Sequence, residues 1–446
     1  MYVLFGDSDF TARLAPALMG TAMIPLCFGF RRLIGRGAAF ATAALLAFEP
    51  TYLYFSRFAR EDIYIACLTL ALIVVIFRFL DRPRKYHPAL IGGLLALSFA
   101  TKESTFITVF VIGSFFLAAL AWERSRPLVW EPVRGVGLEA WGWFFATFAL
   151  VFTLLFTTFL THPGGLWDGI YTGLKYWLDQ QGVGRGGEPK YMYLVVLFGE
   201  EWPALLFGAI GAVAVFKRPT LLGVFLIWDF LLSLAVYSWA SEKFAWLVMH
   251  PLLPLLVLSG IGLQAIWTAR QGILGKVGIA AAAIALFYAA YSSYLVNVKH
   301  GADPRELLVS TQSSTQVKDV ADQVLALARS RGPGQPPLTV TVDSAEGATF
   351  PYAWYFRHLN TGYIDLQQAS AQPPTTDVIV MTDTAHARLA NALPGYRGRQ
   401  FDFRVWWVRD YKGATDPGNW WRWMTARKVW NPTGGMKEWL YTRKGA

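Results

Sequence analysis

The chain consists largely of long apolar segments separated by short loops. Of its 446 residues, 54% are hydrophobic and only 16% are charged, a balance that soluble proteins of this length rarely have. Since roughly 20 apolar residues span a bilayer, we expect about ten membrane-spanning helices in residues 1–298. The predicted helices are 14–30, 38–55, 63–80, 88–101, 104–122, 141–161, 191–216, 219–238, 245–268 and 272–294. The sequence therefore predicts a polytopic α-helical membrane domain.

Alternate loops between these helices are basic and contain few acidic residues. They carry Arg31, Arg32, Arg36, Arg82, Arg84, Lys85, Arg124, Arg126, Arg134, Lys217, Arg218, Arg270 and Lys276. Cytoplasmic loops carry such an excess, so we expect a multi-pass protein of the plasma membrane with these loops inside the cell. The same pattern accounts for most of the net charge of +10, and nucleic acid is not an expected partner, whereas membrane lipids are.

Residues 299–446 differ in composition from the membrane domain. Segments 338–342, 377–381 and 401–408 have the pattern of strands, and the apolar residues of 317–327 recur at helical spacing. This alternation predicts a C-terminal α/β domain on the extracytoplasmic side. Asp343 and Asp383 follow two of the strands, where a carboxylate either binds a ligand or, more frequently, caps a turn or helix.

Three charged clusters lie on the predicted extracytoplasmic side: residues 56–62, 101–104 and 241–243. Ionised groups at or near the bilayer are costly, so they indicate function by default. The candidate bases are Asp62 and Glu61, which would accept a proton from a hydroxyl group. The candidate cations for a phosphate are Arg57, Arg60, Lys102 and Lys243, with His250 as a further donor. Local salt bridges that cap helices are the alternative for each cluster.

The sequence contains no group of His, Cys and carboxylate residues at metal-ligand spacing and no glycine-rich phosphate loop. A divalent metal is compatible with the acidic residues but is not supported by any spacing, so no cofactor is assigned. The two cysteines, Cys27 and Cys67, lie in apolar segments and are expected to be buried thiols.

Several short motifs carry a resemblance to a known family. They are Asp9–Leu18, Arg57–Asp62, Ala100–Glu103, Glu242–Lys243 with His250–Pro254, Asp303–Glu306 and Phe350–Tyr355. Because these motifs occur in the same order as in that family, the chain resembles GT-C class glycosyltransferases that use polyprenyl-phosphate sugars (glycosyltransferase family 39-like). This class includes protein O-mannosyltransferases and aminoarabinose transferases. Within it, the chain is most similar to a subfamily labelled flippase-activity-associated.

The resemblance implies an inverting transfer of a mannose-like sugar from a polyprenyl-phosphate donor to a protein, lipid or glycan acceptor outside the cell. Asp62 matches the acidic position of the family's second outer loop, and Arg13 joins the residues expected to hold the donor phosphate. The family's principal catalytic acid lies in an outer loop after its first helix. We expect that helix and loop to precede Met1, so the chain as given would lack this acid.

Two other interpretations remain open. The chain could be a non-catalytic accessory protein for translocation of lipid-linked sugars, in which case neutralising Asp62 would leave its role intact. It could instead be a membrane scaffold or transporter subunit, in which case it would show no saturable binding of a lipid phosphate.

Overall fold

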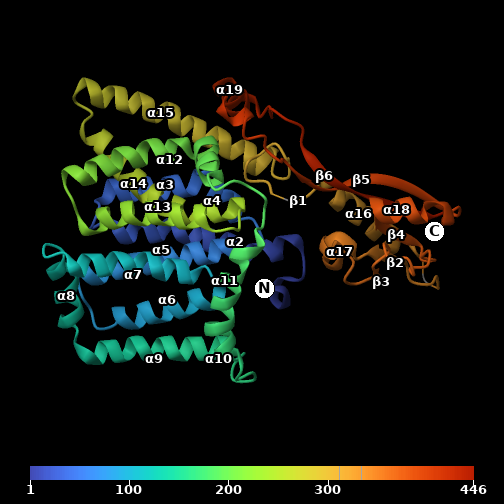
Figure 1. The fold of residues 1–446 in the computed structure, drawn as a ribbon, viewed down its shortest axis with the longest axis horizontal. Helices are drawn as coiled ribbons and strands as arrows, with labels where there is room; N and C mark the ends of the chain where they lie inside the picture. Colours follow the sequence, from blue (N-terminus) through green and yellow to red (C-terminus); the bar gives the residue numbers. More distant parts are fainter. Residues whose placement is uncertain (311, 333, 446) are drawn as a thin grey trace. The chain divides into compact units, whose positions relative to one another are not determined.

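The computed structural model describes residues 1–310, 312–332 and 334–445. The chain divides into two compact units, Met1–Lys299 and His300–Ala446, which are drawn in Figure 1 and treated separately below. The first unit is helical. The second contains a six-stranded sheet with helices.

The helical unit contains fifteen α-helices and four short 3-10 or π-helical turns in its described residues. They are α1 (Tyr2–Phe5), α2 (Asp9–Leu26), η1 (Cys27–Phe30), α3 (Arg36–Phe48), α4 (Pro50–Phe55), α5 (Asp62–Asp81), α6 (His87–Thr101), α7 (Thr105–Ala121), α8 (Arg126–Gly135), α9 (Gly137–Phe156), α10 (Gly165–Trp167), η2 (Asp168–Thr172), α11 (Gly173–Val183), α12 (Met192–Lys217), α13 (Leu221–Trp239), η3 (Ala245–Val248), α14 (Met249–Thr268), α15 (Ile273–Tyr294) and η4 (Leu295–Lys299).

The predicted apolar segments are helical, but the segment 38–55 is divided at Glu49, before Pro50, into α3 and the short α4. Seven helices have the length and composition to cross a membrane, and α7 with α8 forms an eighth candidate that is bent by 105°. The remaining two segments, α3 and α6, are shorter apolar helices of 13 and 15 residues. The polytopic helical fold is thereby confirmed.

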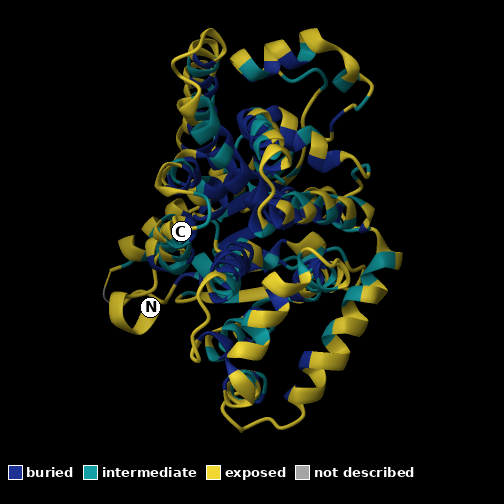
Figure 2. Cartoon of the chain, turned by 90° about the vertical axis from the view of Figure 1, so that its left-hand side faces the viewer, coloured by how far each residue is buried: buried dark blue, intermediate teal, exposed yellow. Residues whose placement is uncertain are grey.

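Helix α14 lies at the centre of the unit, since 83% of its apolar window is buried inside the chain. Helices α3, α12 and α13 pack around it, and buried residues concentrate where these helices meet (Figures 1 and 2). Glycine permits the close approach: a Cβ at Gly260 would lie 2.1 Å from Thr42 Oγ1 of α3, and one at Gly262 would lie 2.0 Å from the Phe207 carbonyl of α12. Small residues serve this purpose in membrane helix packing generally.

Helix α12 is kinked near its middle. Glu201 leaves helical geometry, with φ −119° and ψ 21°, two residues before Pro203. Proline lacks a backbone donor and its ring clashes with the preceding turn, so the helix kinks rather than ends here.

The second unit contains six strands and four α-helices among its described residues. They are β1 (Gln312–Ser313), α16 (Thr315–Ser330), β2 (Thr339–Asp343), η5 (Ala345–Gly347), α17 (Thr349–Tyr355), β3 (Asn360–Ile364), β4 (Val378–Thr382), α18 (Asp383–Leu389), η6 (Ala390–Ala392), β5 (Tyr396–Trp406), η7 (Gly413–Thr415), α19 (Pro417–Ala426) and β6 (Gly434–Arg443).

The sheet has the order β1-β5-β6-β4-β2-β3. Strand β2 pairs in parallel with β3 and β4, whereas β6 pairs antiparallel with β4 and β5. Two apolar clusters form its cores, one around Val340, Tyr352 and Phe403 and the other around Ile379 and Tyr441. Strands β2, β4 and β5 and helix α16 match the predicted segments, while β1, β3 and β6 were not predicted.

Most tryptophans near the C-terminus pack within this unit. Trp407, Trp420 and Trp423 are buried, and Trp430 lies 4.5 Å from Trp407 and 5.3 Å from Trp420 between ring centroids. Trp421 is the exception, with 71% exposure. Trp407, Trp420, Trp423 and Trp430 therefore form packing contacts within the unit.

Candidate functional site

Asp62 is a buried carboxylate at the start of helix α5. It lies in the first helical turn, where negative charge is favourable, and is 1% exposed. Arg60 Nε donates to Asp62 Oδ2 at 3.1 Å, and Lys102 Nζ pairs with Asp62 Oδ1. One carboxylate is thus held by two cations, and the structure brings together two of the three predicted charged clusters.

Glu61 and Trp246 surround this pair. Glu61 Oε1 lies 3.3 Å from Lys102 Nζ and 3.4 Å from Arg60 NH2, and its side chain is 43% exposed. The Arg60 guanidinium stacks 3.9 Å above the ring of Trp246 in η3, a cation–π contact that fixes its plane. The role of Trp246 could not be predicted from the sequence, because no pattern links two residues so far apart in the chain.

Lys102 lies in the short turn between α6 and α7, and from there its side chain reaches Asp62. It is the C-cap of α6 and has extended geometry, with φ −161° and ψ 144°, just before α7 begins at Thr105. The side chain is 13% exposed, so the pair is largely but not completely shielded from solvent. Ions in such a position interact more strongly than at an open surface.

Lys243 is held differently from Lys102. Its Nζ donates to the carbonyl of Tyr237 at 3.2 Å and to that of Ala240, at the C-terminal end of α13. The side chain is buried, and burial, with a smaller effect of Lys190, lowers the pKa of Lys243. Its ammonium group therefore supplies hydrogen bonds to carbonyl groups at the C-terminal end of α13. It would have to give up these hydrogen bonds to bind a phosphate.

Residues at the end of α11 and in the loop after it form hydrogen bonds with the charged cluster 241–243. Lys243 N donates to the Arg185 carbonyl at 2.9 Å, and Ser241 binds Gln181 through its amide and hydroxyl at 3.1 and 2.6 Å. Gly186 adopts φ +95°, and a Cβ there would lie 2.2 Å from the Lys243 carbonyl. We call residues 181–187 the glycine strap. The helical segments α10, η2 and α11 precede this loop.

Three other predicted residues lie outside the Asp62 contacts. Arg57 donates to the Asn297 carbonyl at 2.5 Å. Arg13 is exposed near the start of α2 and forms no ion pair within the described residues. His250 is buried in α14, with its ring stacked on Tyr237 at 4.6 Å between centroids.

A small polar cavity lies among α5, α7, α13 and α14. Its volume is about 20 Å³, enough for one water molecule, and its lining includes Thr69, Asp229, Tyr237 and His250. Within the described residues, Thr69 Oγ1, Tyr237 Oη and His250 Nε2 are buried without a hydrogen-bond partner. A water in this cavity would satisfy such atoms.

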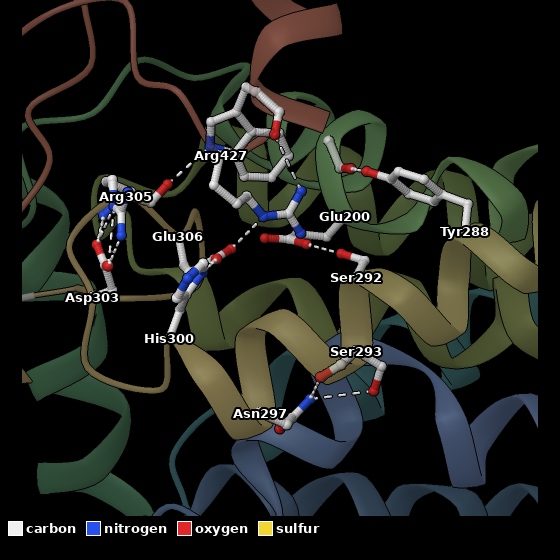
Figure 3. A network of polar contacts seen from close by, with 12 residues as sticks. Glu200, Tyr288, Ser292, Ser293, Asn297, His300, Asp303, Arg305, Glu306 and Arg427 are labelled. Atoms are coloured by element: carbon white, nitrogen blue, oxygen red, sulfur yellow. Dashed lines mark hydrogen bonds and ion pairs between the residues drawn. The ribbon is translucent and has the colours of Figure 1, made fainter. Parts of the chain in front are cut away.

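A pair of buried glutamates lies elsewhere in the helical unit. Glu49 Oε1 and Glu201 Oε1 both accept from Thr51 N, at 3.1 and 3.2 Å, and Glu201 also accepts from the Thr51 hydroxyl at 2.7 Å. The neighbouring Glu200 accepts from Ser292 Oγ at 2.7 Å (Figure 3). The sequence offered one signal for these residues, namely carboxylates inside apolar segments.

The second unit has its own buried ion pair. Arg427 Nε donates to Glu306 Oε2 at 2.8 Å, and His300 Nδ1 lies 2.7 Å from Glu306 Oε1 (Figure 3). The Arg427 guanidinium also lies 4.0 Å from the ring of Trp423. This network ties the first residues of the unit to helix α19.

The strand-end aspartates of the second unit are engaged in structural bonds. Asp343 Oδ2 accepts from the Thr382 hydroxyl at 2.6 Å, which joins the ends of β2 and β4. Asp383 Oδ1 accepts from Gln400 Nε2 at 2.9 Å and from Trp439 Nε1 at 2.6 Å. These contacts favour structural roles over ligand binding.

The Asp62 cluster has the groups needed for one kind of chemistry. Its carboxylates can accept a proton, and its guanidinium and ammonium groups can hold a phosphate through N–H donors that remain available. In the part of the chain that the structure describes, no group of three or more His, Cys, Asp or Glu side chains is arranged to hold a metal ion.

Comparisons with known proteins agree with this architecture. Residues 1–156 match the family model described as dolichyl-phosphate-mannose-protein mannosyltransferase. ArnT from Cupriavidus metallidurans, whose structure was determined with bound undecaprenyl phosphate, is 16% identical over 90% of this chain and 83% of its own, with a TM-score of 0.54. No curated protein matches the chain by sequence.

A second similar structure is the oligosaccharyltransferase of Archaeoglobus fulgidus, determined with a tethered acceptor peptide. It is 14% identical, with a TM-score of 0.52, over 85% of this chain and 59% of its own length. At such identities, structural likeness establishes the fold alone. The chain therefore has the GT-C fold, and the resemblance to GT-C glycosyltransferases is confirmed at that level.

Proposed function

We propose that the chain is a membrane glycosyltransferase that moves a sugar from a polyprenyl-phosphate donor to an acceptor outside the cell. The donor sugar would be mannose-like, as the family match of the first 156 residues suggests. The acceptor would be a protein, lipid or glycan. The protein would be a multi-pass component of the plasma membrane with its second unit extracytoplasmic.

One observation carries this proposal: Asp62 is almost fully buried and is contacted by both Arg60 and Lys102. The carboxylate and the two cations lie close together, and a glycosyl transfer needs both kinds of group. The cations stabilise the charge on the departing phosphate, and the carboxylates assist removal of the acceptor proton.

The reaction would be a single displacement with inversion. The acceptor oxygen forms a bond to the anomeric carbon while the bond from that carbon to the phosphate oxygen breaks. The electron pair of the broken bond leaves on polyprenyl phosphate. The acceptor proton passes to a carboxylate, with Asp62 and Glu61 as the candidates present in this chain.

Arg60 and Lys102 are the cations best arranged to hold the donor phosphate. The Arg60 side chain is 34% exposed and its guanidinium plane is fixed by Trp246, which suits recognition of phosphate oxygens. Lys243, Arg57, Arg13 and His250 would contribute only after rearrangement or from a greater distance.

A second candidate follows from the same contacts. Because Asp62 is already paired with two cations, it could serve to order them rather than to accept a proton. The chain would then bind a lipid-linked sugar as a non-catalytic accessory protein for its translocation.

The test uses the purified protein reconstituted in liposomes. Polyprenyl-phosphate mannose with a labelled sugar is added, and binding and the appearance of free polyprenyl phosphate are measured with peptide and glycan acceptors, against empty liposomes. We expect saturable binding and protein-dependent release. Binding without release would favour the accessory protein, and absence of both would refute either function.

A further inference from the structure

A second cavity lies at the basic ends of helices α2 and α5, apart from the candidate active site. Its volume is about 210 Å³, whereas the water-sized cavity beside His250 has about 20 Å³. Its charged lining consists of five arginines and one carboxylate: Arg31, Arg32, Arg78, Arg82, Arg84 and Asp81. We call it the arginine cavity.

The fold brings these arginines together from two parts of the chain. Arg78 lies in the last turn of α5, and Arg82 follows directly as the C-cap of this helix, with φ −144° and ψ 86°. Arg31 and Arg32 follow η1, which packs against α5. The contact requires Gly29, because a Cβ there would lie 2.3 Å from Val74 Cγ1.

Little negative charge opposes this cluster. Arg82 Nε lies 3.9 Å from Asp81 Oδ2, a long contact between exposed groups. Arg31 donates to the Phe28 carbonyl at 2.9 Å, and Arg32, Arg78 and Arg84 form no ion pair within the described residues. Packing several arginines around one cavity costs energy through mutual repulsion, which a bound anion would offset.

His87 gives a second, independent indication of a ligand. It lines the cavity and is only 6% exposed, yet its Nδ1 has no hydrogen-bond partner among the residues that the structure describes. The ring is positioned by Tyr86, 4.6 Å away between centroids, and by Phe79 at 6.1 Å. A buried polar atom without a partner is unfavourable unless water or a ligand supplies one.

We propose that the arginine cavity binds the phosphate of an anionic lipid headgroup. Arginine forks match phosphate oxygens, and basic cavities at the ends of membrane helices are suited to such headgroups. A lipid is the expected source of the phosphate because the cavity lies at the end of apolar helices, on the face that the charge pattern predicts to be cytoplasmic.

This site is separate from the proposed transfer reaction. Asp62 begins α5, and Arg78 lies sixteen residues further along the same helix, which corresponds to about 24 Å at 1.5 Å per residue. The inference therefore does not depend on the proposed function, and failure of one leaves the other intact.

The experiment measures lipid binding by the full chain in detergent, using phosphatidylglycerol as the probe and phosphatidylcholine as the uncharged comparison. The test variant is Arg78→Gln with Arg82→Gln, and Arg31→Gln with Arg32→Gln tests the other wall if the first variant misfolds. The matched control is Arg124→Gln with Arg134→Gln, which removes two charges from the same predicted side outside the cavity. His87→Phe tests the buried ring nitrogen.

We expect either cavity variant to bind phosphatidylglycerol at least roughly ten-fold more weakly, and His87→Phe to weaken binding by a smaller factor. The control should stay within about two-fold of the unchanged protein. An equal loss in the control, or no loss in either cavity variant, would overturn the proposal. Binding of inorganic phosphate as tightly as phosphatidylglycerol would overturn the lipid as the source.

Discussion

Lys102 and Asp62 form an ion pair that joins the turn between α6 and α7 to the first turn of α5, across 40 residues of sequence. The carboxylate also accepts from Arg60, so each charge of this cluster depends on its neighbours for compensation. The cluster is therefore both a structural joint between helices and the candidate active site, and the two roles can be separated by substitution.

Replacing Lys102 with methionine removes the cation but keeps an unbranched side chain. Asp62 would keep Arg60 as a partner, so we expect a loss of stability of about 2 kcal/mol, less than for a buried carboxylate left unpaired. Thermal unfolding of the detergent-solubilised protein measures this. Lys102→Arg, which preserves the charge, should lose much less, and equal losses in both variants would contradict the ion-pair account.

Replacing Gly186 with alanine should detach the glycine strap. The added Cβ would lie 2.2 Å from the Lys243 carbonyl, and alanine is disfavoured at φ +95°. We expect faster hydrogen exchange of residues 181–187 and of Lys243 N. Gly182→Ala is the matched control, since nothing lies within 4 Å of a Cβ at that position. Unchanged exchange in Gly186→Ala would show that the strap contact is not formed in solution.

Glu438 should make the second unit less stable as pH rises. Burial raises its pKa from 4.5 to about 8, while the hydrogen bond from Tyr352, at 2.7 Å, opposes the shift. Between these two pKa values the folded unit retains a proton that the unfolded chain has released, so stability falls across that window and levels off above it.

Hydrogen exchange of β6, measured in the full chain from pH 5 to pH 9 and corrected for intrinsic rates, would report this dependence. Glu438→Gln, which is neutral at every pH, should make the profile less steep, and Glu306, whose pKa burial raises to about 7, accounts for the remaining slope. Asp319→Asn, at an exposed position of α16 that does not contribute to the shift, should leave it in place. A profile that is equally steep in Glu438→Gln would assign the dependence to another group.

Arg427→Met should destabilise the second unit strongly. The Arg427 and Glu306 side chains are 1% and 0% exposed, and burial raises the pKa of Glu306 while Arg427 opposes that shift. Breaking a buried pair from one side costs about 3 kcal/mol or more. Arg305→Gln, which breaks the exposed pair with Asp303, should cost less than about 1 kcal/mol.

Adding Glu306→Gln to Arg427→Met removes the uncompensated carboxylate. The double variant should recover part of the loss, as read from the unfolding transition of the full chain. If the two changes are simply additive, the pair contributes no coupling energy and the role assigned to it is wrong.

The helical architecture could be predicted from the sequence because apolar length alone largely determines it. The sequence also predicts that Asp62, Lys102 and Lys243 lie on the same side of the membrane, because the basic loops indicate the direction in which each helix crosses it. Two of these residues meet in the structure, because both occupy helix ends that face the same direction.

Contacts that depend on tertiary packing could not be predicted. Lys243 donates to carbonyl groups at the C-terminal end of α13 and not to Asp62, because these carbonyl groups lie only a few residues before it in the chain. Trp246 contacts Arg60, and Glu201 shares Thr51 with Glu49, through pairings that no local pattern encodes. Strand β3 was missed because its sequence, Asn-Thr-Gly-Tyr-Ile, lacks apolar alternation.

The most direct measurement of the central proposal compares the unchanged protein with Asp62→Asn in reconstituted liposomes. Asparagine preserves shape but can neither accept the acceptor proton nor pair with Lys102 as an ion. The proposal predicts that donor binding persists within about ten-fold while turnover of the labelled sugar falls by about a hundred-fold or more. Glu61→Gln, at the exposed neighbouring position, should reduce turnover far less. Turnover by Asp62→Asn at the rate of the unchanged protein would contradict the role of this carboxylate and, with it, the proposed active site.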